Sequence, residues 1–307
     1  MILDISIIIP YYKGKKYLDR IERNLKEYIF NVDVEHKVSF EIIMINDSPS
    51  EPLELTRWMK NNIILINNKV NKGIHYSRVE GLKAAHGKYI QFMDQDDSID
   101  FKELEMSFLK MNKLNADVII NNGKFEFFDG TSADIYTTSN YKKSILIESN
   151  YLNVRDLIIS PGQCLIKKDS IPESWQKNIM HISGTDDYLL WLLMFNENRL
   201  FKFCDNVVYI HKNSGENLSL DIKNWKESLI DLEYNLSIVP DYPVKKIKRL
   251  HRLNLYKLTL ANNNRVTKVI ESVKNVDLLI INVMFRILNG SFAVKIRNGN
   301  FTPSNKQ

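Results

Sequence analysis

Residues 71–97 read NKGIHYSRVEGLKAAHGKYIQFMDQDD, and this stretch decides the fold. A helical pattern leads into an apolar run, KYIQFM at 88–93, which ends in a turn that carries three aspartates. Short β-rich runs of the same kind flank it: ISIII at 5–9, EIIMI at 41–45, NIILI at 62–66 and DVII at 117–120. Strands that alternate with helices predict an α/β fold, with right-handed βαβ units in a Rossmann-like, mainly parallel sheet covered by helices on both faces.

Polar residues follow three of these runs. PYYKG at 10–14 follows the first run, NDS at 46–48 the second and DQDD at 94–97 the fourth. Ligands of α/β sheets bind beyond the carboxyl ends of parallel strands, so we expect these side chains to share one rim. The sequence therefore predicts a nucleotide-binding type of architecture with its site at this rim.

The aspartate turn is the sharpest feature of the rim. Asp94, Asp96 and Asp97 repel one another unless a cation neutralises them, and oxygen ligands select a hard ion such as Mg2+ or Mn2+. A calcium loop of the EF-hand type is excluded, because Ile99 stands where that loop needs glycine. On the residues alone, the turn is equally well explained as a cap for a helix that starts near Asp100.

Composition and cysteine usage narrow the class of protein. The chain has 307 residues, of which 44% are hydrophobic and 26% charged, and it can bury a substantial core. Cys164 and Cys204 lack the spacing of zinc ligands, so we expect neither a zinc site nor a disulfide framework. The absence of an 18-residue apolar run and of a leader-like start predicts a cytoplasmic protein.

The net charge of +5 is distributed unevenly. Residues 241–307 hold 13 Lys and Arg against three acids, which leaves the front part of the chain acidic. An acidic front suits a cation-binding site, whereas a basic rear suits an anionic surface or a solvated helix face. We therefore expect a catalytic domain over 1–217 and a basic helical extension over 218–307.

An apolar stripe with helical periodicity lies inside the basic extension. Over 266–288 it comprises Val266, Val269, Ile270, Val273, Val276, Ile280, Val283, Met284 and Ile287. The stripe could pack on the catalytic domain, pair two copies as a homodimer, or lie peripherally on an anionic membrane surface. We favour packing or pairing. The extension has no stacked-aromatic or zinc-finger signature, so we expect no nucleic-acid partner.

The ordered set of rim motifs resembles family 2 glycosyltransferases. Members of that family read, in order, Pro-x-Tyr-Asn, Asp-Asp-x-Ser, Asn-x-Gly, Ala-Arg-Asn, Gly-x-Tyr and Asp-x-Asp-Asp. The counterparts here are PYYK at 10–13, NDS at 46–48, NKG at 71–73, SRV at 77–79, GKY at 87–89 and DQDD at 94–97. The resemblance covers residues 1 to about 215 and implies a GT-A-type fold for a nucleotide-sugar-binding domain.

The resemblance also implies a donor and a metal. The donor would be a nucleoside diphosphate sugar, with uridine as the expected nucleoside, and Mn2+ or Mg2+ would bridge its diphosphate. The donor would be bound by Pro10, Tyr12, Asp47, Gly73, Arg78, Asp94 and Gln95, and the metal by Asp96 and His211. Independently of any family, departure of a nucleoside diphosphate develops negative charge that a bound cation stabilises.

A second acidic motif would serve the acceptor. The segment SGTDDYLLWL at 183–192 places paired carboxylates at a helix start and resembles the Glu-Asp motif of the same family. By that resemblance Asp187 is the catalytic base for the acceptor hydroxyl, and Asp186 lies on the acceptor side. Trp191, one turn after Asp187, is a further acceptor-side candidate, but a Trp in the run YLLWLLM is more often part of a core, and we favour the core. On the residues alone, both acids could instead compensate the helix dipole.

Three residues depart from the family motifs and leave the identities of the donor sugar and its nucleobase open. Lys13 replaces the usual Asn, Asn46 replaces the first acid of Asp-Asp, and Val79 replaces the Asn after Arg. The Gln-x-x-Arg-Trp motif of processive synthases is absent, so we expect one sugar per encounter. The expected activity is an inverting, metal-dependent transfer to a hydroxyl of a glycan, lipid-linked or protein-linked acceptor, in bacterial surface polysaccharide or glycoprotein assembly. The alternatives are a nucleotidyltransferase and a non-catalytic nucleotide-sugar- or glycan-binding protein.

Overall fold

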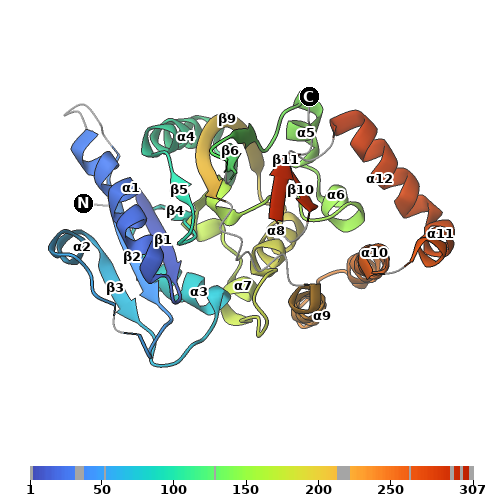
Figure 1. Cartoon of the computed structure of the whole chain (residues 1–307), viewed down its shortest axis with the longest axis horizontal. Helices are drawn as coiled ribbons and strands as arrows, with labels where there is room; N and C mark the ends of the chain where they lie inside the picture. Colours follow the sequence, from blue (N-terminus) through green and yellow to red (C-terminus); the bar gives the residue numbers. More distant parts are fainter. Residues whose placement is uncertain are drawn as a thin grey trace.

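The computed structural model describes residues 3–31, 38–51, 53–127, 129–212, 222–262, 264–290, 294–297 and 300–303. These residues form a mixed α/β fold in which a curled sheet has helices on both faces and a helical C-terminal region lies at one end of the molecule (Figure 1). The domain boundary expected at 217/218 lies outside the described residues. No helix among the described residues is both long and apolar enough to cross a membrane.

The central sheet has nine strands in the described part of the chain, in the order β3-β2-β1-β4-β8-β6-β9-β5, with β7 paired to β6. Its strands are β1 Ile5–Tyr11, β2 Phe40–Asn46, β3 Ile64–Asn67, β4 Tyr89–Phe92, β5 Ser98–Ile99, β6 Val118–Glu126, β7 Ser132–Asp134, β8 Cys164–Lys167 and β9 Phe201–Lys212. A separate antiparallel pair consists of β10 Val294–Arg297 and β11 Asn300–Pro303. The four runs predicted before residue 97 all form strands and lie parallel to one another. Beyond them β8 runs antiparallel to β4 and β6, and β9 runs parallel to β6.

Twelve α-helices occur in the described residues. They are α1 Leu18–Asn31, α2 Arg57–Asn62, α3 Ile74–Ala84, α4 Phe101–Leu114, α5 Ser139–Ser144, α6 Glu148–Asn153, α7 Glu173–Lys177, α8 Asp186–Asn196, α9 Ile222–Ser237, α10 Val244–Asn262, α11 Arg265–Lys274 and α12 Val276–Asn289. Short 3-10 turns occur at Lys15–Tyr17, Pro161–Gln163 and Lys168–Ser170. Helix α4 is capped by Asp100, whose carboxylate accepts from the Glu103 amide; the aspartates at 94–97 lie before β5 and do not form this cap.

Two cores lie on opposite faces of the sheet. Along β1, Ile7 belongs to the core formed with α1, α2 and α4, whereas Ile8 belongs to the core formed with α3 and α8. Side chains alternate between the faces of a strand, so a near-continuous apolar run supplies both cores. Both cysteines are buried in these cores as free thiols. The sheet is thereby held as a rigid support for the loops at its carboxyl edge.

The C-terminal region differs from its prediction in two ways. The helix expected over 266–288 is two helices, because Asn275 leaves helical geometry, at φ −117° and ψ 41°, between α11 and α12. All nine side chains of the apolar stripe are exposed, so the expectation that the stripe packs on the catalytic domain is wrong. Helix α12 instead buries Leu278 and Phe285. We call the nine stripe residues together with Leu288, which is also exposed, the outer apolar face.

Candidate active site

A cavity of about 580 Å³ opens at the carboxyl ends of β1, β2 and β4. Of the predicted site residues, those that line it are Pro10, Tyr12, Asp47, Gly73, Arg78, Asp94, Gln95, Asp96, Asp186, Asp187 and His211. The strand-end motifs therefore do share one rim with the motif at the start of α8. This is the place where parallel sheets bind their ligands.

The loops after β1 and β4 are joined by Gln95. Its side-chain oxygen accepts from the Tyr12 amide at 2.9 Å, and its side-chain nitrogen donates to the Tyr12 carbonyl at 3.0 Å. A Cβ at Gly14 would come within 2.3 Å of the same Gln95 oxygen, so only glycine leaves room for this contact. The Tyr12 ring, 43% exposed, remains available as a flat apolar surface at the cavity wall. Gln95 thus orients the aromatic wall.

Asp47 organises the loop that leads into α3. Its carboxylate accepts from the Asn68 side chain at 2.8 Å and from the Lys72 and Gly73 amides at 2.9 Å and 2.7 Å. Gly73 has φ +87°, which favours glycine, and it begins α3 without a side-chain cap. Asp47 satisfies amides there and sets the position of α3 relative to β2. The sequence places Asp47 at the rim, but these backbone contacts are visible only in the fold.

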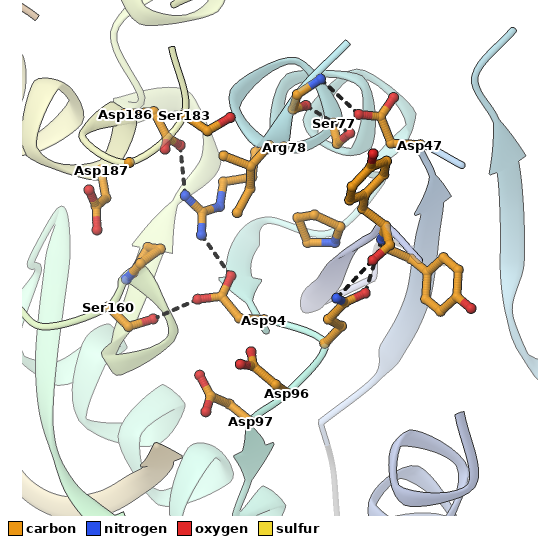
Figure 2. Close-up of a pocket in the computed structure, with 18 of the residues that line it drawn as sticks. Asp47, Ser77, Arg78, Asp94, Asp96, Asp97, Ser160, Ser183, Asp186 and Asp187 are labelled. Carbon is orange, nitrogen blue, oxygen red and sulfur yellow. Dashed lines mark hydrogen bonds and ion pairs between the residues drawn. The ribbon is translucent and has the colours of Figure 1, made fainter. Parts of the chain in front are cut away.

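Arg78 is the central cation of the cavity. Its guanidinium donates to Asp186 Oδ2 at 2.7 Å and to Asp94 Oδ1 at 2.7 Å, and its side chain is only 3% exposed (Figure 2). Burial by itself would lower the pKa of Arg78, but the charges of Asp186 and Asp94 outweigh burial and raise it. Arg78 is not a surface residue paired with Glu80, since Glu80 pairs with Lys83. It therefore remains a buried cation that joins the two acidic motifs.

Asp94 has a second partner that the sequence did not indicate. Ser160 donates from Oγ to Asp94 Oδ2 at 3.2 Å, so both carboxylate oxygens of Asp94 are held (Figure 2). Ser160 stands before the 3-10 turn Pro161–Gln163 and caps it. It lies in a segment without a recognisable periodicity, and the SPG sequence at 160–162 is the one local signal that could have indicated a turn there.

Asp96, Asp97 and His211 all line the cavity. The Asp97 carboxylate, 1% exposed, lies 3.2 Å from His211 Nδ1 and accepts from the Lys212 amide at 2.8 Å and from the Tyr209 hydroxyl. Burial lowers the pKa of His211, yet the charge of Asp97 outweighs it and the pKa is raised. Asp97 thus orients the imidazole, as carboxylates do behind metal-binding histidines.

The described residues alone do not supply a full set of metal ligands. Within the described ranges, no group of three or more His, Cys, Asp or Glu side chains is arranged to hold a metal ion. Asp96 and His211 nevertheless line the same cavity. One or two protein ligands are usual where substrate phosphates and water complete the coordination of Mg2+, and carboxylate oxygen also suits Mn2+. The residues present fit a cation shared with a diphosphate.

Asp187 lies in the first turn of α8 and lines the same cavity. Its carboxylate accepts from the Tyr188 amide at 2.8 Å. Burial, followed by the neighbouring charge of Asp186, raises the pKa of Asp187 to about 7. The pKa of Asp156 is also raised, first by burial and then by the charge of Asp187. A carboxyl with a pKa close to neutral is suited to exchange a proton during a reaction.

Trp191, the further acceptor-side candidate, lies in the core and not on the acceptor side. Its side chain is 0% exposed, does not line the cavity and packs edge-on against Phe201, with ring centroids 6.3 Å apart. Position 191 is one helical turn beyond Asp187, and α8 is buried on most of its circumference. The core interpretation of the run YLLWLLM is therefore correct.

Comparison with known proteins places this geometry in a family. The model of the family described as glycosyl transferase family 2 matches residues 6–175. The chain belongs to this family. It is therefore a glycosyltransferase, which decides between sugar transfer and nucleotidyl transfer. The family match and the curled α/β fold confirm the predicted GT-A-type class.

Relatives and solved structures agree with this assignment. An uncharacterized glycosyltransferase of Haemophilus influenzae is 28% identical over 68% of this chain and 77% of that protein. One from Rickettsia bellii is 29% identical over 64% of this chain, which spans only 27% of that protein's length. The structure of Staphylococcus aureus TarS 1–349 in complex with UDP-GlcNAc has a TM-score of 0.59 at 16% identity, covering 99% of this chain and 97% of that one. The structural likeness shows the shared fold.

Proposed function

We propose that this glycosyltransferase moves one sugar from a nucleoside diphosphate sugar, with uridine as the nucleoside, to a hydroxyl of an acceptor, with inversion at the anomeric carbon. One observation carries the proposal. The strand-end residues expected to bind the donor and the Asp187 carboxyl face one cavity, and Arg78 ties the two halves together. A leaving group on one side and a base on the other suit an in-line displacement.

The donor half would work by orientation and charge. Tyr12 would lie against the nucleobase of the donor. Asp94, held by Arg78 and Ser160, would accept hydrogen bonds from the ribose or the sugar. Asp96 and His211 would hold Mn2+ or Mg2+ against the diphosphate. When bound, such a cation stabilises the negative charge that develops on the departing diphosphate.

The acceptor half would work by proton transfer. Asp187, ionised at and above neutral pH, would take the proton of the acceptor hydroxyl as the oxygen attacks the anomeric carbon. Asp186 would act through Arg78 and through its effect on Asp187, and its place on the acceptor side stays a prediction. The acceptor would be a glycan, glycolipid or glycoprotein of the bacterial surface. Two relatives carry names of that kind: a minor teichoic acid biosynthesis protein of Bacillus subtilis and a poly(ribitol-phosphate) N-acetylglucosaminyltransferase of S. aureus.

A thermal-shift screen tests the donor half directly. UDP-glucose, UDP-galactose, UDP-GlcNAc and GDP-mannose are each added with and without Mn2+, and one UDP-sugar should raise the melting temperature more when Mn2+ is present. Asp96→Ala should remove the part of the shift that depends on Mn2+. Asp169→Ala, at an exposed aspartate that does not line the cavity, should keep it. If Asp96→Ala retained the full shift, the role assigned to Asp96 as a metal ligand would be wrong. If no UDP-sugar raised the melting temperature, the assignment of uridine as the nucleoside of the donor would be wrong.

A further inference from the structure

The outer apolar face lies along α11 and α12 at the outer edge of the molecule (Figure 1). Its ten side chains are between 45% and 76% exposed, and Ile287 is the most exposed of them. Single exposed apolar residues need no explanation, but ten of them along two successive helices mark a surface that contacts something else. The sugar-transfer site does not use this face, since none of these residues lines the cavity.

Polar contacts on the inner side of α12 hold this face outward. At its start, Asp277 pairs with Arg249 and Arg252 of α10. In its middle, the Asn282 side chain donates to the Asn153 carbonyl of α6 at 3.0 Å. At its end, Asn289 accepts from Ser144 Oγ at 2.8 Å. Rotating α12 to bury its isoleucines would break contacts along its whole length, so the outward orientation is specified.

A cluster of cations borders the same helix. Lys257 of α10 donates to Asn282 at 2.6 Å, and the charges of Arg155 and of Arg286 on α12 reach it. Burial, and then these two cations, lower the pKa of Lys257 to about 7. Residues 244–289 as a whole carry ten Lys and Arg against Glu271 and Asp277. The complementary surface is therefore both apolar and negatively charged.

We propose that the outer apolar face docks on an anionic lipid bilayer, with its apolar side chains among the lipid tails and the exposed Arg286 of α12 toward lipid phosphates. Helices with an apolar face and basic residues beside it bind bilayers in this manner, and each basic residue near an anionic surface adds to the attraction. A second copy of the chain is the less suitable partner. A two-fold contact through this face would set the same basic residues against each other.

Vesicle co-sedimentation of the full chain tests the proposal. Vesicles of phosphatidylcholine alone are compared with vesicles that also contain phosphatidylglycerol, at low and at high salt. We expect pelleting with the anionic vesicles, reduced by salt. The double variant Ile280→Asp/Ile287→Asp should reduce the bound fraction several-fold, and Arg286→Glu should reduce it at low salt. All three positions are exposed, so melting temperatures should stay at the wild-type value.

Matched controls lie on α4, in the catalytic part of the chain. Leu109→Asp/Leu114→Asp introduces the same two charges at apolar side chains that are 47% and 42% exposed, and Lys113→Glu makes the same charge reversal at an exposed lysine. Neither should change vesicle binding. Absence of pelleting by the wild-type chain, equal binding to neutral vesicles, or unchanged binding of the α12 variants would overturn the proposal. So would light scattering that finds a dimer separated by Ile280→Asp/Ile287→Asp together with no vesicle binding, which would make the face a subunit contact.

Discussion

Arg78 Nη1 lies 2.7 Å from Asp186 Oδ2, and this contact joins α3 to the start of α8 across 108 residues of sequence. The other terminal nitrogen of the same guanidinium holds Asp94. The distance between two acidic motifs that are far apart in the chain is thereby fixed. Most of the expected mechanism depends on that separation, because a base and a leaving group must face the same carbon.

Removing Arg78 should destabilise the protein. Arg78→Leu leaves Asp186 and Asp94 without their cation, and a buried ion pair broken in this way costs about 3–5 kcal/mol. Lys83→Leu, on the same helix, removes an exposed pair with Glu80 and should cost less than about 1 kcal/mol. Urea unfolding measures both. Equal unfolding free energies for the two variants would contradict the bridging role.

Asp187→Asn should separate transfer from donor binding. We expect loss of transfer by at least about 100-fold, the contribution of a positioned base, with the nucleotide-sugar affinity within a few-fold of wild type. The folded state binds the Asp187 proton more tightly than the unfolded chain does, so the ionised carboxylate costs stability as the pH rises from about 4 to about 7. In urea unfolding at pH 8 the variant should therefore be more stable than the wild type, by up to about 4 kcal/mol. Retained transfer would remove Asp187 from the mechanism.

The pH profile of transfer should report Asp187. Because the pKa of Asp187 is raised to about 7, kcat/KM should rise with pH through neutrality as the base ionises. Asp186 contributes to that raised pKa, so Asp186→Asn should move the acidic limb of the profile to lower pH. Glu80→Gln, outside the cavity, should leave it in place. An acidic limb that stayed put in Asp186→Asn would show that another group titrates.

Asp97 should control metal use without contacting the donor. Asp97→Asn weakens the hold on His211 Nδ1, and loss of such an orienting carboxylate lowers metal affinity by about 10- to 100-fold. The Mn2+ concentration for half-maximal transfer should rise accordingly, while saturating Mn2+ restores the rate. Asp169→Asn serves as the control. Unchanged metal dependence in Asp97→Asn would mean that His211 needs no orientation.

A substitution of Trp191 tests whether this side chain belongs to the core or to the acceptor site. Trp191→Phe removes part of a fully buried side chain, which should lower stability by about 1–3 kcal/mol through loss of packing. The acceptor KM should not change, because Trp191 does not line the cavity. A large increase in acceptor KM at unchanged stability would return Trp191 to the acceptor site.

The sequence by itself determined the elements and the order of the motifs. Apolar runs such as 5–9 and 88–93 encode strands locally, and parallel strands bring the residues after them to one edge. The positions of Pro10, Asp47 and Asp94 at one rim therefore follow from the order of the runs along the chain. The family model matches residues 6–175, the part of the chain that holds these motifs.

Only the tertiary structure decided which side chains meet. Ser160 reaches Asp94, and Asp97 reaches His211, across separations that no local pattern encodes. The same is true of burial: the apolar run at 188–194 and the periodic stripe over 266–288 show that Trp191 and Ile287 lie on apolar helix surfaces, but not what those surfaces meet. Packing buried Trp191 in the core, and polar contacts along α12 turned Ile287 toward solvent. Hydrophobic periodicity specifies a face, whereas its partner is set by the free energy of the whole fold.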